Sequence, residues 1–236
     1  MDTKRGSARG DLERLVTRAG RGELGELPDV HRVDARAQSD FRDAAVLVLL
    51  TPTAAASAGP PAADLFLVQR SPLLRQHPGQ IALPGGRRDP QDRDIVATAL
   101  RETHEEIGLA PGRVEVIGTL PRVAVPVSRF IVTPVVGWAA DADALGEVEE
   151  GEVLHTLRLP VSGLLDPASR ATVTIQGFGS AGFAVQGGWV WGFTGNLLDH
   201  LFDELGWTRP WDRARTYEMS FAEARGATLP PPTPEG

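Results

Sequence analysis

The segment from Leu83 to Leu109 constrains the fold of this chain more than any other, because it joins a Gly-Gly turn to a helix rich in acidic residues. A helix advances about 100° per residue, so Glu102, Glu105 and Glu106 share one stripe of about 100° near its C-terminal end. That end carries the negative pole of the helix dipole, and close carboxylates also repel each other. The segment therefore predicts an exposed or cleft-facing acidic stripe that a cation would stabilise.

The other side of the same helix is expected to face a hydrophobic core. Val96, Leu100, Thr103 and Ile107 fall on an arc centred more than about 90° from the glutamates. Gly108 follows them and is suited to end the helix, because glycine adopts the left-handed backbone conformation there.

Acidic stripes of this kind also occur on solvated helix faces, so the glutamates alone do not specify a metal site. Arg101 can relieve part of their repulsion. Carboxylate oxygens are the ligands that Mg²⁺ and Mn²⁺ prefer, and such an ion would relieve more of it.

Apolar runs of strand length surround this segment. The predicted strands span residues 44–50, 63–70, 113–120, 130–139 and 152–159. A hairpin is predicted from residues 171–178 and 183–193, and an amphipathic helix from residues 194–205. This order predicts an α+β fold with α/β/α layers, in which a mixed β-sheet is sandwiched between helices.

The length of 236 residues suits one domain with extensions. Residues 1–43 are polar, with a weak helical pattern, and are predicted to be an N-terminal extension that packs on the domain. Residues 44–208 form the predicted domain. Residues 209–236 turn polar and then proline-rich, so we expect a disordered tail.

Composition narrows the class of protein. A hydrophobic content of 42% supports a core, and the lack of cysteine excludes disulfides, thiolate metal sites and a cysteine nucleophile. A net charge of −7 argues against broad binding to nucleic acid or acidic membranes. No apolar run reaches the roughly 18 residues of a membrane span. We expect a cytoplasmic protein without nucleic-acid or membrane partners; its oligomeric state is open, with a homodimer as one alternative.

The helix and its turn resemble the Nudix box of the Nudix hydrolase family. The matching residues are Arg101, Glu102, Glu105, Glu106, Gly108 and Leu109. Thr103 stands where an apolar residue is usual. Counting forward from Gly86 places Asp92 at the first glutamate position of the box, with one extra residue before Arg101. This offset and this substitution resemble the coenzyme A pyrophosphatase subgroup.

A second stretch, residues 65–86, is similar to the upstream signature of that subgroup. The matching residues are Arg70, Ser71, Arg75, Gly79, Pro84, Gly85 and Gly86. Leu83 replaces the usual phenylalanine, and Val68 stands where threonine or isoleucine is expected. The resemblance covers about residues 44–205 and implies the Nudix fold.

The resemblance implies a hydrolase that uses Mg²⁺ or Mn²⁺ to cleave the diphosphate of coenzyme A or its derivatives. The products would be 3′,5′-ADP and 4′-phosphopantetheine or its acyl form. It implies metal ligation by Glu102 and Glu106, with Glu105 as a further ligand or the catalytic base. Arg101 is expected to orient these carboxylates.

Substrate phosphate is expected to contact Arg70 and Arg75, because a guanidinium group offers a planar, bidentate fork. Gly85 and Gly86 would let the backbone approach the metal or phosphate where a Cβ would obstruct it. The alternatives are surface arginines at a strand end and an ordinary tight turn. A further acid could come from residues 147–152, with Glu152 as the best candidate, although a solvated acidic loop is the simpler interpretation.

Two other functions remain open at this stage. A Nudix pyrophosphatase could act on another nucleoside diphosphate compound, such as ADP-ribose or a dinucleotide, or on a nucleoside triphosphate. A Nudix domain could also serve as a non-catalytic, ligand-binding regulator. The intact glutamates favour catalysis over that last function.

Overall fold

The structure is a computed structural model that describes residues 7–27, 40–53, 61–73, 77–142 and 153–225. Arg75, Glu152 and the rest of the acidic stretch 147–152 lie outside the described residues.

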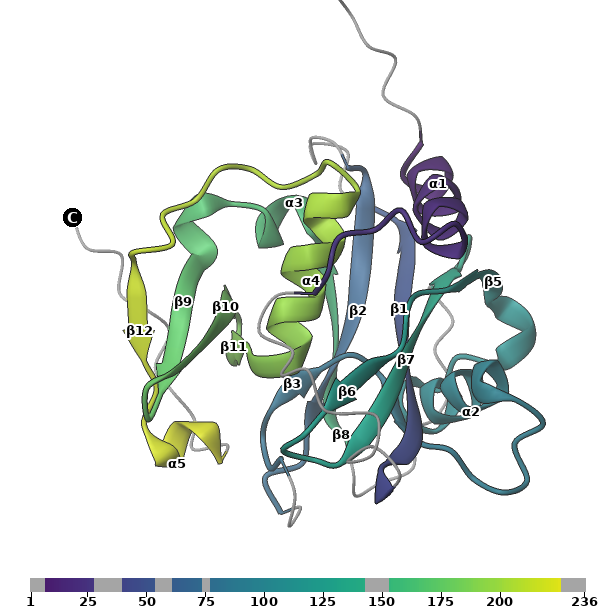
Figure 1. The fold of residues 1–236 in the computed structure, drawn as a ribbon, viewed down its shortest axis with the longest axis horizontal. Coiled ribbons are helices and arrows are strands. Elements are labelled where there is room, and N and C mark those ends of the chain that lie inside the picture. The colour runs from purple at the N-terminus through teal and green to yellow at the C-terminus, as the bar shows by residue number, and fades with distance from the viewer. Residues whose placement is uncertain (1–6, 28–39, 54–60, 74–76, 143–152, 226–236) are drawn as a thin grey trace, which may run out of the picture.

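A mixed sheet forms the centre of the molecule (Figure 1). Its strands among the described residues are β1 (Arg42–Pro52), β2 (Ala63–Arg70), β3 (Ile81–Ala82), β4 (Gly85–Arg87), β5 (Glu115–Thr119), β6 (Val123–Val125), β7 (Phe130–Trp138) and β8 (Val153–Pro160). Five of them lie in the order β3-β2-β1-β7-β5, while β4 pairs with β1, β6 with β7 and β8 with β2. The five strands predicted from apolar runs correspond to β1, β2, β5, β7 and β8.

Strand β1 lies at the middle of this sheet, antiparallel to β2 and parallel to β7. Its side chains alternate between two hydrophobic clusters. Leu47 and Leu49 belong to one cluster, and Val48 and Leu50 belong to the other, on the opposite face. Both faces are covered, which explains why the strand is a continuous apolar run without polar alternation.

Helices cover both faces of the sheet (Figure 1). The helix α2 (Ile95–Ile107) packs on one face, and α1 (Ala8–Gly20) and α4 (Gly192–Glu204) pack on the other. Short helical turns complete the connections: η2 (Pro111–Arg113), α3 (Val161–Leu164) and η3 (Pro167–Ser169). The predicted α+β fold with α/β/α layers is confirmed. None of the helices in the described ranges combines the length and apolarity needed to cross a bilayer.

The helix α1 belongs to the same core as the domain. Its first turn is capped by Ser7, whose hydroxyl accepts a hydrogen bond of 3.2 Å from the Gly10 amide. Leu12 and Leu15 are buried in the hydrophobic cluster that also contains residues of α4. Arg18 pairs with Glu204 at 2.6 Å. The N-terminal extension therefore packs on the domain through this helix.

A second, smaller sheet follows the first. It has the order β11-β10-β9-β12, formed by β9 (Arg170–Ile175), β10 (Phe178–Val185), β11 (Gly188–Val190) and β12 (Thr216–Glu218). The predicted late hairpin is present as β9 and β10, with its turn at Gln176 and Gly177. A further tight turn leads into β11, which the sequence pattern did not separate from β10.

The prediction of disorder from residue 209 is wrong for residues 209–225. β12 pairs with β9 in parallel, joining Thr216 to Thr172 and Glu218 to Thr174. The short helix α5 (Phe221–Ala224) follows. Strand pairing uses backbone groups, so a polar sequence can form it without an apolar pattern. Residues 226–236 lie outside the described part of the chain.

A buried arginine fastens this C-terminal part to the domain. Arg170 is 1% exposed, and its guanidinium group donates a hydrogen bond of 2.5 Å to Asp199 on α4. The rings of Phe183 and Trp211 lie 3.9 and 4.4 Å from the guanidinium carbon. The second carboxylate oxygen of Asp199 accepts a hydrogen bond of 3.1 Å from Arg213. Burial lowers the pKa of Arg170, and the Asp199 carboxylate opposes this shift by favouring the charged guanidinium group.

We expect Asp199→Asn to destabilise the fold strongly, because it leaves a buried guanidinium group without its anion. Breaking such a buried pair typically lowers the free energy of unfolding by about 3–5 kcal/mol. Chemical denaturation at neutral pH measures the loss. The control is Asp203→Asn on the same helix, since Asp203 is half exposed and lies 3.8 Å from Arg213. Equal stabilities of the two variants would contradict the role given to the buried pair.

Candidate functional site

The helix α2 begins and ends at well-defined caps. Asp94 accepts a hydrogen bond of 2.8 Å from the Ala97 amide at its start. Gly108 ends it with φ 72°, and its amide donates to the His104 carbonyl at 2.9 Å. The prediction that Gly108 stops the helix is confirmed. These caps fix the length of the helix, and with it the positions of the three glutamates.

The three glutamates do not share one degree of exposure. The side chain of Glu105 is 45% exposed, that of Glu102 is 17% exposed and that of Glu106 only 5%. The expected exposed or cleft-facing stripe therefore describes Glu105 and, in part, Glu102, whereas Glu106 is buried and turns toward the end of β2.

The opposite side of the helix packs on the sheet much as the pattern predicted. Thr103 and Ile107 are fully buried, whereas Val96 and Leu100 are only partly buried. Thr103 occupies a position where an apolar residue is usual. Its hydroxyl donates a hydrogen bond of 2.7 Å to the Ala99 carbonyl, which satisfies it inside the core.

Arg101 is the hub of the acidic side chains. Its Nε and Nη2 atoms donate to the two carboxylate oxygens of Asp92 at 3.0 and 3.1 Å. It also pairs with Glu102 and Glu105, each at 2.9 Å. These contacts raise the pKa of Arg101. One guanidinium group thus contacts three carboxylates and fixes their relative positions. This arrangement agrees with the expected role of Arg101 in orienting them.

Asp92 is a member of this group to which sequence reasoning gave no role. Besides Arg101, its carboxylate accepts hydrogen bonds of 2.9 Å from the Asp89 amide and from the Thr98 hydroxyl. Hydrogen bonding to Arg101 is the main cause that lowers the pKa of Asp92 to about 2. The sequence had placed Asp92 at the first acidic position of the box, counted from Gly86, but its bonds to Arg101 and Thr98 were not predicted.

The two glycines of the turn are required by close approach. A Cβ on Gly85 would lie 2.3 Å from the Ala45 carbonyl oxygen on β1, and one on Gly86 would lie 2.5 Å from the Glu102 carboxylate carbon. β4 therefore sits tightly between β1 and the acidic helix. Both positions require glycine, as expected, but the groups that leave no room for a Cβ are Ala45 and Glu102. Contact of this turn with metal or phosphate stays a prediction.

Arg70, the last residue of β2, meets the inward-facing glutamate. Its Nη1 atom lies 3.6 Å from one carboxylate oxygen of Glu106, and the other oxygen accepts a hydrogen bond of 2.9 Å from the Gly85 amide. The Nε atom of Arg70 is buried and has no hydrogen-bond partner among the described residues. An unsatisfied buried donor is unfavourable, so this edge is suited to an anionic ligand.

The donor set matches a hard divalent cation in chemistry. Carboxylates from Glu102, Glu105 and Glu106 offer the oxygen ligands that Mg²⁺ and Mn²⁺ prefer. In the described part of the chain, no three acidic or histidine side chains are already grouped as ligands of one ion. Arg101 and Arg70 provide the positive charge beside these carboxylates instead.

The low pKa of Asp92 gives a testable pH dependence. Its ordinary value of 3.8 falls to about 2 in the folded protein, so the stabilisation is complete above pH 3.8 and is lost as the pH falls toward 2. The shift corresponds to about 2 kcal/mol of unfolding free energy. We therefore expect the stability difference between wild type and Asp92→Asn to shrink between pH 4 and pH 2. Denaturation curves across this range measure it, with Asp212→Asn as the control. A constant difference would refute the assignment.

Comparison with known proteins identifies the family. The NUDIX domain profile matches residues 41–173. The Nudix hydrolase NudL of Klebsiella pneumoniae strain ATCC 700721 is 39% identical over 156 residues, which cover 62% of this chain and 77% of that protein. NudL of Enterobacter sp. strain 638 is 38% identical over 147 residues, 60% of this chain and 75% of its own length.

Among solved structures, the Nudix hydrolase RenU of M. smegmatis is similar, with 27% identity, a TM-score of 0.42, and coverage of 53% of this chain and 74% of that one. The NUDIX domain of Shewanella oneidensis NrtR, solved with ADP ribose, has 21% identity and a TM-score of 0.39, with coverage of 59% and 85%. The profile match and the identity to the NudL proteins establish that this chain belongs to the Nudix hydrolase family.

Proposed function

We propose that this Nudix hydrolase cleaves the diphosphate of coenzyme A or a derivative, giving 3′,5′-ADP and 4′-phosphopantetheine or its acyl form. The observation that carries the proposal is the position of Arg70. This arginine of the upstream signature lies beside Glu106 of the box, with a buried donor that lacks a partner among the described residues. Arg70 and Arg101 are 31 residues apart in the sequence. The contact between Arg70 and Glu106 therefore brings the upstream signature and the box together at the end of β2.

The acidic helix would hold Mg²⁺ or Mn²⁺ through Glu102 and Glu106. When bound, such an ion neutralises charge on the phosphate oxygens. Glu105 is the most exposed of the three glutamates and is bonded to Arg101 at one oxygen, so it is the best placed to take a proton from water or to serve as a further ligand. Arg101 and Asp92 would keep these carboxylates oriented during turnover.

Arg70 would bind the diphosphate itself, because it sits next to a proposed metal ligand. Its buried Nε would then donate to a phosphate oxygen, which removes the cost of an unsatisfied donor. Arg75, which lies outside the described residues, remains the candidate for the 3′-phosphate. A cytoplasmic location and the choice between monomer and homodimer also stay predictions from the sequence.

The substrate class is tested by product analysis. The protein is incubated with coenzyme A, NADH, ADP-ribose and nucleoside triphosphates in the presence of Mg²⁺ or Mn²⁺, and the products are identified by mass spectrometry. We expect 3′,5′-ADP and 4′-phosphopantetheine from coenzyme A, at the highest rate of the panel. Faster cleavage of ADP-ribose or a dinucleotide would assign a broader pyrophosphatase, and no cleavage would favour a ligand-binding regulator.

Glu106→Gln should reduce turnover by orders of magnitude, because it removes a charged oxygen from the proposed metal site while keeping the size of the side chain. Steady-state rates over a Mg²⁺ titration and direct binding of Mn²⁺ measure the effect. Glu115→Gln on β5 is the control, since the ion-pair partner of Glu115 among the described residues is Arg9 on α1 and neither residue belongs to the proposed site. Near-normal turnover of Glu106→Gln at saturating Mg²⁺ would show that the metal assignment is wrong.

A comparison of coenzyme A with 3′-dephospho-coenzyme A separates the two arginines. Losing the partner of a charged donor costs about 1.5–3 kcal/mol, or roughly 10- to 150-fold in kcat/KM. Wild type should favour coenzyme A by about this factor, and Arg75→Ala should shrink the preference. Arg70→Ala should slow both substrates equally, because both contain the diphosphate.

Arg93→Ala is the control for this comparison, since Arg93 is exposed and pairs with Asp94. Equal rates of the wild type on both substrates would refute a 3′-phosphate contact and favour a broader specificity.

A further inference from the structure

The C-terminal strap is defined as residues 211–225. It runs along the edge of the second sheet and ends beside Gln80, in the loop before β3. It starts at Trp211, follows β9 as β12 and ends in α5 (Figure 1). Each part of it is held by contacts with a different element of the domain.

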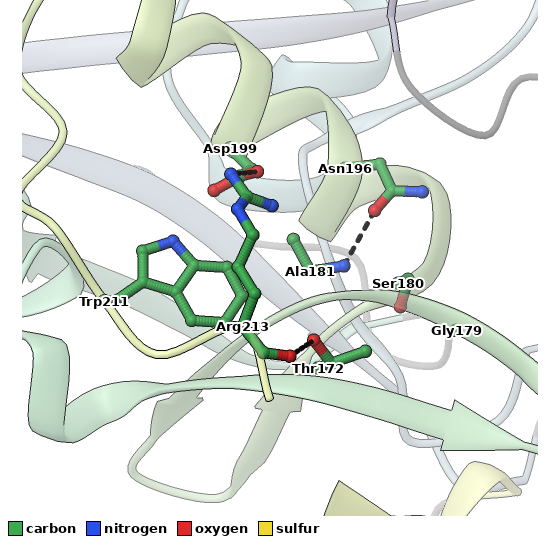
Figure 2. A pocket seen from close by; sticks show the side chains of 8 residues that line it. All are labelled: Thr172, Gly179, Ser180, Ala181, Asn196, Asp199, Trp211 and Arg213. Carbon is green, nitrogen blue, oxygen red and sulfur yellow. Dashed lines mark hydrogen bonds and ion pairs between the residues drawn. The ribbon is translucent and has the colours of Figure 1, made fainter. Parts of the chain in front are cut away.

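The first anchor of the strap is a pocket of about 230 Å³ between β9, β10 and α4 (Figure 2). Trp211 and Arg213 enter it from the strap, next to Asp199. The ring of Trp211 covers the buried Arg170, and the Arg213 carbonyl accepts a hydrogen bond of 2.8 Å from the Thr172 hydroxyl. This end of the strap is therefore bound to both the second sheet and α4.

The second anchor lies along the edge of β9. Tyr217 packs against Trp189, with ring centroids 4.8 Å apart, and the Met219 amide donates to the Thr174 carbonyl at 2.8 Å. Met219 is 5% exposed and belongs to a hydrophobic cluster with Val173. The strap thus has a small core of its own.

The short helix α5 is held by a capping box and by a hydrogen bond from Tyr217. Ser220 and Glu223 form a capping box at its start. The Tyr217 hydroxyl donates to the Glu223 carboxylate at 2.7 Å, and burial with this neighbour raises the pKa of Tyr217 to about 12. These bonds fix the short helix whose last residue, Ala224, presents its carbonyl to Gln80.

The side chain of Gln80 contacts that end of the strap. Its Nε2 atom donates a hydrogen bond of 3.2 Å to the Ala224 carbonyl. Its Oε1 atom faces the Nδ1 atom of His77 at 2.8 Å, so this nitrogen carries the proton. Its backbone carbonyl accepts a hydrogen bond of 2.9 Å from the Arg70 amide. One residue therefore touches the strap, the loop and the backbone of the proposed phosphate-binding arginine.

The loop needs such support because its backbone is strained. His77 has a φ of 52°, in the left-handed region that residues other than glycine rarely adopt. A strained conformation persists only where neighbouring contacts hold it, and it is often found at ligand sites. Within the described residues of this loop, His77 is held by its side-chain bond to Gln80 and by a hydrogen bond of 3.4 Å from the Gln80 amide to the His77 carbonyl.

We infer that Gln80 is a positioning residue and that the C-terminal strap belongs to the substrate-binding apparatus. Through Gln80 the strap holds residues 77–80 and sets the backbone of Arg70, which places the guanidinium group beside Glu106. The inference rests on the proposed function only in that Arg70 binds the phosphate of the substrate. It goes beyond that function by assigning a role to residues 211–225, which lie outside both motifs.

This geometry predicts that changes in the strap affect KM and kcat differently. Arg101 and Asp92 hold the acidic helix independently of the strap. Loosening the strap should therefore weaken phosphate binding and raise KM, while kcat changes little. A general loss of folding would instead lower the fraction of active protein and reduce the apparent kcat with no change in KM.

The test uses full-length variants. Gln80→Ala removes both side-chain bonds, and Gln80→Glu keeps an acceptor for His77 but loses the donor to Ala224. Loss of one hydrogen bond of about 0.5–1.5 kcal/mol predicts a rise in KM of roughly 2- to 12-fold for Gln80→Glu, and Gln80→Ala, which loses two bonds, should raise KM at least as much. Gln69→Ala is the matched control, because Gln69 lies one residue before Arg70 and bonds to Gly187, outside the strap.

A variant within the strap tests the contact between α5 and Gln80 without changing Gln80 itself. Ser220→Ala breaks the capping box of α5 and should raise KM in the same direction. Ser7→Ala removes a comparable cap from α1 and should leave KM unchanged. A wild-type KM in Gln80→Ala would overturn the positioning role, and a wild-type KM in both Gln80→Glu and Ser220→Ala would overturn the role of the strap.

Amide hydrogen exchange gives a reading that does not depend on activity. The Arg70 amide is bonded to the Gln80 carbonyl, so it should exchange faster in Gln80→Ala and Ser220→Ala than in wild type, while amides of β1 stay protected. If the wild type hydrolyses no diphosphate, the proposed function fails, and exchange still decides the coupling. Unchanged exchange at Arg70 in both variants would refute the inference even in an active enzyme.

Discussion

The charge balance around Arg101 is the interaction on which the proposed site depends. Asp92, Glu102 and Glu105 each contact its guanidinium group, and without it three carboxylates would stand close together with two of them at the negative end of α2. Arg70 does the same for the buried Glu106 from the neighbouring strand. The chain can therefore fold with a dense group of carboxylates, because the two arginines offset much of its negative charge.

Much of the fold could be predicted from the sequence, because burial leaves a direct pattern. The apolar run of β1 reflects a strand covered on both faces, and Gly108 marks the end of α2. The short strands β3, β4 and β6 were not predicted, since two or three residues carry no periodicity. The strap was misjudged for a related reason: β12 is held by backbone bonds to β9 and by few side chains, which composition does not record.

The site itself was only partly predictable. The glutamates of α2 and Arg70 were proposed because they match the box and the upstream signature, whereas the inward turn of Glu106 depends on Gly85 and the end of β2, far away in the sequence. Gln80 left no signal, because a glutamine in a loop is ordinarily a solvated residue. Its importance arises from a carbonyl at Ala224, 144 residues later. Contacts between polar groups so distant in sequence have no pattern that a single chain displays.

That separation has a consequence for biosynthesis. Domains generally begin to fold from the N-terminal side while the chain is still being made. α2, β1 and β7 are complete by Trp138, so the acidic helix can assemble early. The strap comes later in the chain than these elements, and Gln80 has to wait for it before its side chain can donate to the Ala224 carbonyl. A nascent chain would thus carry its acidic helix before the loop at residues 77–80 has its contact with Ala224.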